Sequence, residues 1–160
     1  MTSNKLKTVE LLIIEDNPGD VRLIKEILKE SELSYRFHVV EEGDLALDFL
    51  YRRGNHIDAP KPDLILLDWN LPKKEGKFFL SKIKKTVHLR NIPIIVFTSS
   101  NAEKDVLTAY DLHANCYINK PIDLDHYTKV IKSIEQFWLK IVSLPPYMND
   151  EENIHEHSVD

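Results

Sequence analysis

The strongest constraint on the fold lies between Pro62 and Pro72, where four aliphatic residues in a row stand between two aspartates. An apolar run of this length without alternation predicts a strand buried on both faces, as in the middle of a parallel sheet. Asp68 ends the run, and open α/β sheets bind their ligands outside the carboxyl ends of the strands. Pro72 prevents the strand from continuing. The stretch therefore predicts a rigid strand that presents a carboxylate at a ligand-binding edge.

The rest of the chain predicts an alternation of strands and helices. The predicted strands are residues 9–14, 37–40, the run before Asp68, 92–97 and 116–118. The predicted helices are one that begins near Pro18 with Asn17 or Asp16 as its cap, and then residues 44–53, 74–86, 103–112 and 123–142. Five strands that alternate with five helices predict a parallel sheet covered by helices on both faces.

Composition places the chain among single-domain globular proteins. Its 160 residues are 42% hydrophobic and 29% charged, which is ordinary for such a domain. The longest apolar runs are too short to span a bilayer, and no signal peptide precedes the first strand. Its single cysteine, Cys116, rules out an intramolecular disulfide and is compatible with a reducing compartment. We therefore expect a cytoplasmic protein that does not associate with a membrane.

The net charge of −5 is concentrated at the C-terminus. Residues 150–160 contain five acidic residues and no Lys or Arg, so the rest of the chain has 21 of each sign. A domain that binds nucleic acid directly needs a basic surface, which a neutral body does not supply. We therefore expect no direct nucleic-acid partner.

Polar side chains collect where the predicted strands end. If the strands are parallel, one edge of the sheet gathers Glu15, Asp16, Asp68, Thr98 and Lys120. Three neighbouring carboxylates repel one another unless a pKa shifts or a cation binds. Oxygen ligands without cysteine or histidine suit Mg²⁺. A hydroxyl and an ammonium beside them could bind the oxygens of a phosphoryl group, which an aspartate can itself accept.

These residues resemble the receiver domain of two-component response regulators over residues 8–142. The resemblance rests on Glu15-Asp16 after the first strand, Asp68-Trp-Asn-Leu-Pro after the third, Thr98 after the fourth and Lys120-Pro121 after the fifth. Each motif is weak alone, but four in the correct order at strand ends make a strong signal. The resemblance implies an α/β fold with a doubly wound, flavodoxin-like sheet in the strand order 2-1-3-4-5.

The resemblance also implies a role for each acidic residue. Asp68 would be the phosphoacceptor and, with Asp16, a direct ligand of Mg²⁺. Glu15 would act on the ion through water, and Asn70 through its backbone carbonyl. Read alone, Asp16 could equally be a helix cap.

The remaining residues of the motif would serve the phosphoryl group. Lys120 would bind one of its oxygens, and the peptide bond to Pro121 would be cis. Thr98 would move its hydroxyl to the phosphoryl group, and Tyr117 would follow inward as an aromatic switch, a two-state element biased by one local change of charge. Tyr117 as ordinary core packing remains an alternative.

As such a regulator, the chain would catalyse only its own phosphorylation and dephosphorylation and would not otherwise be an enzyme. Residues 143–160 would form an extension and acidic tail, too short for an output domain. The output would be a changed interaction with a downstream protein, or transfer to a phosphotransfer protein.

A narrower resemblance concerns the partners. The loop of residues 54–62 and the ending at residues 137–146 look like those of stand-alone regulators that serve phytochrome-type sensor kinases. The resemblance therefore implies a sensor histidine kinase of that type as phosphodonor. A homodimer through the apolar last helix and residues 144–146 is a further hypothesis, because the adjacent Phe137 and Trp138 cannot both face the same core.

Three other functions fit parts of this pattern less well. A haloacid-dehalogenase-like phosphatase also uses an aspartate nucleophile, but it needs a second acid where this chain has Asn70. A flavodoxin-like flavin protein needs a hydroxyl-rich phosphate loop after the first strand, where Glu15 and Asp16 would repel phosphate. A receiver-like interaction module that takes no phosphate is disfavoured, because every expected position is filled.

Overall fold

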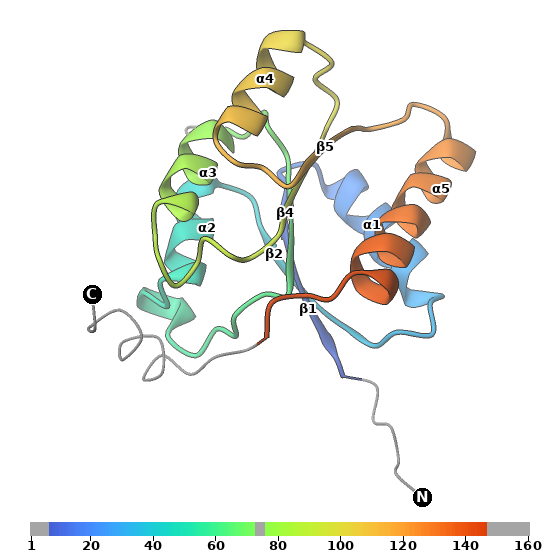
Figure 1. Ribbon diagram of the computed structural model, residues 1–160. Coiled ribbons are helices and arrows are strands. Elements are labelled where there is room, and N and C mark those ends of the chain that lie inside the picture. The colour runs from blue at the N-terminus through green and yellow to red at the C-terminus, as the bar shows by residue number, and fades with distance from the viewer. Residues whose placement is uncertain (1–6, 73–75, 147–160) are drawn as a thin grey trace, which may run out of the picture.

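The computed structural model describes residues 7–72 and 76–146, which form a sheet between two layers of helices (Figure 1). All strand pairs are parallel, and the order is β2-β1-β3-β4-β5, which confirms the expected topology. The strands are β1 (Val9–Ile14), β2 (Tyr35–Val40), β3 (Leu64–Leu67), β4 (Ile94–Thr98) and β5 (Cys116–Asn119).

Helices cover both faces of the sheet, as the alternating pattern predicts. Figure 1 shows α1 and α5 on one face, and α2, α3 and α4 on the other. The helices are α1 (Pro18–Lys29), α2 (Gly43–Leu50), α3 (Gly76–Lys84), α4 (Glu103–Asp111) and α5 (Leu124–Ile134), with a 3₁₀ turn η1 (Gly54–His56) and a π-helical segment η2 (Glu135–Ile141).

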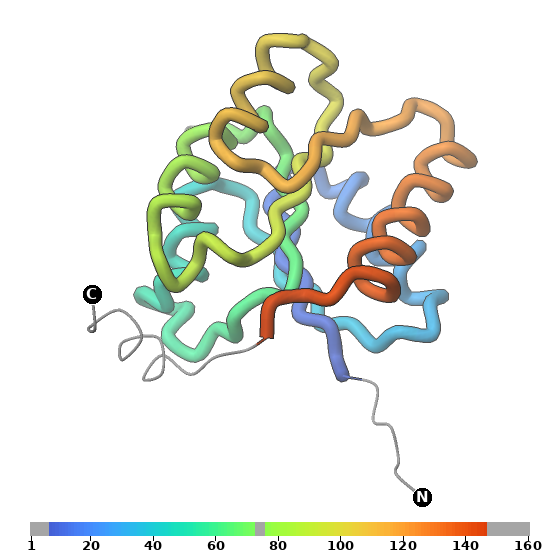
Figure 2. Tube along the Cα trace, viewed as in Figure 1, coloured from blue at the N-terminus to red at the C-terminus, as the bar shows by residue number. Residues whose placement is uncertain are grey.

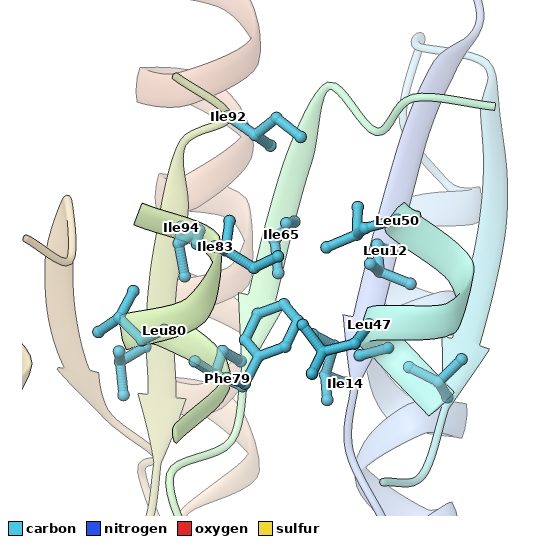
Figure 3. Packing of buried hydrophobic residues seen from close by; sticks show 14 of the residues in the cluster. Leu12, Ile14, Leu47, Leu50, Ile65, Phe79, Leu80, Ile83, Ile92 and Ile94 are labelled. Carbon is cyan, nitrogen blue, oxygen red and sulfur yellow. The ribbon is translucent and has the colours of Figure 1, made fainter. Parts of the chain in front are cut away.

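The core consists of two clusters, one on each side of the sheet. Neighbouring strand residues point to opposite faces, so Leu12, Ile14 and Ile65 pack against α2 and α3, as Figure 3 shows. Leu11 and Ile13 pack on the other side against α1 and α5. All four residues of β3 are buried, which explains why its sequence is an unbroken apolar run.

One predicted helix end was wrong, and a second predicted helix changes type along its length. The helix predicted to reach Arg53 ends at Leu50, and Arg52 has a left-handed φ of 55° that turns the chain away. The helix predicted over residues 123–142 is α-helical only to Ile134 and continues as η2. The predicted start of α3 at Lys74 lies outside the described residues.

The last described residues lie near the amino ends of β3 and β4. Figure 2 shows the chain turning back after η2 toward the end of the sheet where β1 begins. Pro145 and Pro146 line a small pocket there with Pro62 and Pro93. Among the described residues, none of the helices combines the length and the hydrophobicity that a transmembrane span requires.

Candidate functional site

The sheet brings the predicted site residues to one edge through its backbone hydrogen bonds. Three of these bonds continue the strand pairing just past the strand ends. The Glu15 amide donates to Val40, the Asp68 amide to Ile14, and the Lys120 amide to Thr98, at 3.0, 3.0 and 2.8 Å. Glu15, Asp68, Thr98 and Lys120 therefore lie side by side at the carboxyl ends of β1, β3, β4 and β5.

Asp68 sits at the bottom of this arrangement with only 7% of its surface exposed. The fully buried Thr98 hydroxyl donates to Asp68 Oδ1 at 2.7 Å. The backbone amide nitrogen of Asn70 lies 3.4 Å from the same oxygen. Asp68 Oδ2 lies 3.9 Å from Lys120 Nζ. The carboxylate is thus held in a fixed direction from a rigid strand, as its position in the sequence predicts.

Lys120 is in direct contact with two other carboxylates. Its Nζ lies 2.6 Å from Glu15 Oε2 and 3.1 Å from Asp20 Oδ2, both closer than Asp68. Asp20 was not among the predicted site residues. It lies in the first turn of α1, where Asn17 caps the helix by accepting from the amides of Gly19 and Asp20. Nothing in its local sequence separates it from an ordinary N-terminal helix acid.

Glu15, Asp16 and Asp68 form an acidic group that fits a divalent cation. One carboxylate oxygen from each lies within 4.8 Å of the others, and Asp16 is exposed while the other two are buried. Asn17, not Asp16, caps α1, so the Asp16 carboxylate is left for another role. Three carboxylates without nitrogen or sulfur ligands match the preference of Mg²⁺ and Mn²⁺.

Burial and neighbouring charges shift the pKa values of Glu15 and Lys120. Removal from water raises the pKa of Glu15, and the charge of Asp68 raises it further, against the opposing effect of Lys120. Burial alone would lower the pKa of Lys120, but the Glu15 hydrogen bond and the charges of Asp68, Glu15 and Asp20 outweigh it and raise that pKa. Lys120 therefore remains a cation among carboxylates.

Tyr117 is linked to the site through the segment that follows β4. Its hydroxyl donates to the Ser100 carbonyl at 2.8 Å, and the Ser100 amide lies 3.4 Å from Thr98 Oγ1. The half-buried Tyr117 ring packs edge-on against Trp69, with 6.5 Å between centroids. This arrangement joins Thr98, Tyr117 and the residue after Asp68, while the proposed inward movement stays a prediction.

Gly76 is a second residue that sequence reasoning missed. A Cβ at this position would lie 3.0 Å from both the Asp68 carbonyl oxygen and Trp69 Cα. The Gly76 amide also donates to the Trp69 carbonyl at 3.0 Å. The start of α3 therefore packs directly on the backbone of the proposed acceptor, and only glycine allows this approach without a shift.

One expected feature of the site is not found. No peptide bond among the described residues is cis, so the bond between Lys120 and Pro121 is trans. The trans form is the more stable one before proline, by about 0.5–1 kcal/mol. It is compatible with the Lys120 amide continuing the β4–β5 pairing.

Comparison with known proteins gives a consistent result. Residues 11–132 match the model of the response regulator receiver domain family. The chain is 42% identical to response regulator Rcp1 of Synechocystis sp. over 135 residues, 84% of this chain and 92% of that protein. It is 33% identical to a probable methanogenesis regulatory protein, FilR2, of Methanothrix harundinacea, over 81% of this chain and 83% of that one.

Solved structures agree with the sequence matches. The Mn²⁺-bound form of Rcp1 is 41% identical with a TM-score of 0.83, covering 86% of this chain and 99% of that one. The phosphorylated cyanobacterial phytochrome response regulator RcpA is 41% identical with a TM-score of 0.85, over 88% and 100%. The bacteriophytochrome response regulator RtBRR is 32% identical with a TM-score of 0.67, over 94% and 91%.

Proposed function

The chain belongs to the response regulator receiver domains, and from this premise we propose that Asp68 accepts a phosphoryl group from a sensor histidine kinase. The observation that carries the proposal is the surroundings of Asp68. Its buried carboxylate has the Thr98 hydroxyl on one oxygen and the Lys120 ammonium 3.9 Å from the other. A hydroxyl and an ammonium so placed can bind phosphoryl oxygens once the carboxylate has become an acyl phosphate.

In the proposed transfer, a carboxylate oxygen of Asp68 forms a bond to phosphorus while the phosphorus–nitrogen bond of the phosphohistidine breaks. The electron pair of that bond stays on the imidazole nitrogen. Lys120 then moves toward one phosphoryl oxygen. Thr98 turns its hydroxyl from Asp68 Oδ1 to a second phosphoryl oxygen. Because Thr98 is linked through Ser100 to Tyr117, its movement would carry the change to the surface of β4 and β5.

We propose Mg²⁺ as the cofactor of this transfer. Asp16 and Asp68 would bind it directly, Asn70 through its carbonyl and Glu15 through water. The ion offsets the negative charge of the phosphoryl group and of the acceptor. The Mn²⁺-bound form of the related Rcp1 supports a divalent cation, as does the acidic group described above.

The position of the modification can be tested by chemical trapping. Borohydride reduces an acyl phosphate on aspartate to homoserine, which peptide mass spectrometry locates. After incubation with acetyl phosphate and Mg²⁺, we expect homoserine at position 68 only. Homoserine at Asp16 or Asp63 instead would refute the assignment, and Asp63 is a fitting internal control because it lies at the opposite end of the same strand.

We further propose that the phosphodonor is a phytochrome-type kinase, because RcpA and RtBRR are regulators of such photoreceptors by name. Phosphorylated kinase domains from a bacteriophytochrome and from an unrelated sensor should differ in transfer rate, with faster transfer from the bacteriophytochrome. Equal rates would remove this part of the proposal and leave Asp68 unaffected. The output would be a change of interaction with a protein target or phosphotransfer protein, without direct binding to nucleic acid, in the cytoplasm.

A homodimer through α5 and η2 remains part of the proposal. An apolar groove of about 790 Å³ runs along α5 and is lined by Ile122, Val130 and Phe137, among others. Ile122 is fully exposed and Phe137 is 52% exposed, whereas Trp138 packs against the core, as the sequence predicts for one of the two. Phe137→Glu should lower the mass measured by light scattering, and an unchanged mass would count against this surface.

A further inference from the structure

Lys120 is held away from Asp68 by a pair of carboxylates. Its ammonium has three donors, and Glu15 and Asp20 lie within hydrogen-bonding distance of Nζ, at 2.6 and 3.1 Å. Asp68 Oδ2, at 3.9 Å, lies beyond that distance. Because Nζ is closer to both of these carboxylates than to Asp68, a displacement of Nζ toward a phosphoryl group on Asp68 is expected to lengthen one of the two existing contacts.

The contact with Asp20 is the weaker of the two. It is the longer one, and the side chain of Asp20 is 18% exposed against 4% for Glu15. Water can therefore replace Lys120 at Asp20 more easily than at Glu15.

Asp20 is itself held by a buried tyrosine from another helix. The Tyr127 hydroxyl donates to Asp20 Oδ1 at 2.7 Å, while Asp20 Oδ2 faces Lys120. Tyr127 belongs to α5, is 4% exposed, and packs edge-on against Phe97 with 5.3 Å between centroids. Packing of the Tyr127 ring therefore fixes the position of its hydroxyl, which in turn orients the Asp20 carboxylate. The oriented Asp20 carboxylate holds the Lys120 ammonium.

We propose that Asp20 and Tyr127 are positioning residues that restrain Lys120 in the unphosphorylated protein and compete with the phosphoryl group for it. The inference rests on the proposed function, since it concerns the lysine that would bind the phosphoryl oxygen. It adds a second route by which phosphorylation acts on the molecule. When Lys120 leaves Asp20, the hydrogen bond between Asp20 of α1 and Tyr127 of α5 is affected. These helices lie on the opposite face of the sheet from α4.

The competition can be measured with beryllofluoride, which with Mg²⁺ mimics a phosphoryl group on an aspartate. Asp20→Asn keeps the shape of the side chain but removes the charge that attracts Lys120. We expect it to bind beryllofluoride about three- to tenfold more tightly, because the lost contact is a single charge-assisted hydrogen bond. Glu26→Gln removes one charge from the same helix, six residues further along, and should change the affinity by less than twofold.

A double-mutant cycle tests whether Tyr127 acts through Asp20. Tyr127→Phe removes only the hydroxyl and leaves the ring against Phe97. It should also tighten beryllofluoride binding, by a smaller factor, and this effect should vanish when Asp20 is Asn. Tyr35→Phe is the matched control, because the hydroxyl of the half-buried Tyr35 likewise donates to a carboxylate, that of Glu135, far from Lys120. It should have no effect in either background.

Three results would decide the matter. An Asp20→Asn variant no tighter than Glu26→Gln would overturn the inference. A Tyr127→Phe effect that persists in the Asp20→Asn background would show that Tyr127 does not act through Asp20, and would overturn its part in the inference. A wild-type protein that binds no beryllofluoride would instead refute the proposed function itself, and the inference with it.

Discussion

At the scale of single residues, the Thr98 hydroxyl is the group whose role can be isolated most cleanly. It is fully buried and donates to Asp68 at 2.7 Å, so its present partner is the proposed acceptor itself. Phosphorylation would give the same hydroxyl a stronger acceptor nearby. A movement of Thr98 would then displace Ser100 and, through Ser100, Tyr117. The ring of Tyr117 packs against Trp69.

Thr98→Val should therefore separate phosphorylation from switching. Valine has nearly the same shape but no hydroxyl, so Asp68 should still gain a phosphoryl group in the variant. With Trp138 replaced by Phe in both proteins, the fluorescence of Trp69 should change on phosphorylation when Thr98 is present and stay unchanged in Thr98→Val. Thr108→Val is the control, because its exposed hydroxyl donates to the Lys104 carbonyl within α4. A fluorescence change in Thr98→Val equal to that of the wild type would contradict this pathway.

At the scale of elements, the connection from β3 to α3 decides how precisely Asp68 is held. The chain returns after Asp68 so closely that Gly76 touches the backbone of Asp68 and Trp69. A methyl group placed there would push against backbone atoms, which cannot move aside as a flexible side chain would.

Gly76→Ala is expected to destabilise the protein by about 1–3 kcal/mol, the usual cost of overpacking. It should also slow phosphorylation, because the displaced atoms belong to the acceptor. Gly54→Ala is the control. Its φ of +59° makes alanine unfavourable there by about 1–2 kcal/mol, with no atom within 4 Å of the new Cβ. Denaturant unfolding should show comparable losses for both, and a normal phosphorylation rate in Gly76→Ala would refute the argument.

The elements also show what the sequence can and cannot reveal. Unbroken apolar runs and regular helical spacing predicted each strand and helix to within a few residues, because those patterns record burial directly. The left-handed conformation of Arg52 and the π-helix η2 were not predicted. Neither feature produces a regular spacing of apolar residues in the sequence. Glu135, the first residue of η2, bonds to Tyr35, a residue 100 positions away.

The same limit applies to the site. The positions of Asp68, Thr98 and Lys120 at this edge could be predicted because each directly follows or ends an apolar strand segment. Asp20 and Gly76 could not, since their importance arises from contacts made only after folding, to Lys120 and to the Asp68 backbone.

At the scale of the whole molecule, the acidic edge affects stability. Burial raises the pKa of Glu15 from its ordinary value to about 7. In the unfolded chain the group loses its proton near pH 4.5, so between these values the folded state binds more protons. The contribution of Glu15 to the free energy of unfolding is therefore present below pH 4.5 and is lost as the pH rises toward 7.

Glu15→Gln should flatten this dependence. Without added metal, the wild type should lose stability relative to the variant between pH 4.5 and 7, by up to about 3 kcal/mol. Mg²⁺ should stabilise the wild type more at pH 8 than at pH 5.5, because protons compete with the ion for carboxylates. Thermal unfolding at several pH values measures both effects, with the exposed Glu30→Gln as control. An equal effect of Mg²⁺ at both pH values would contradict the assignment of the metal site.

Transfer of a phosphoryl group to Asp68 with the help of a divalent cation would be visible directly by intact mass spectrometry. The wild type, Asp68→Asn and the control Asp63→Asn would be incubated with acetyl phosphate, with and without Mg²⁺. We predict that the wild type and Asp63→Asn gain the mass of one phosphoryl group only when Mg²⁺ is present, and that Asp68→Asn gains none. An unmodified wild type, or an Asp68→Asn variant that is modified as fully as the wild type, would show that Asp68 is not the phosphoacceptor.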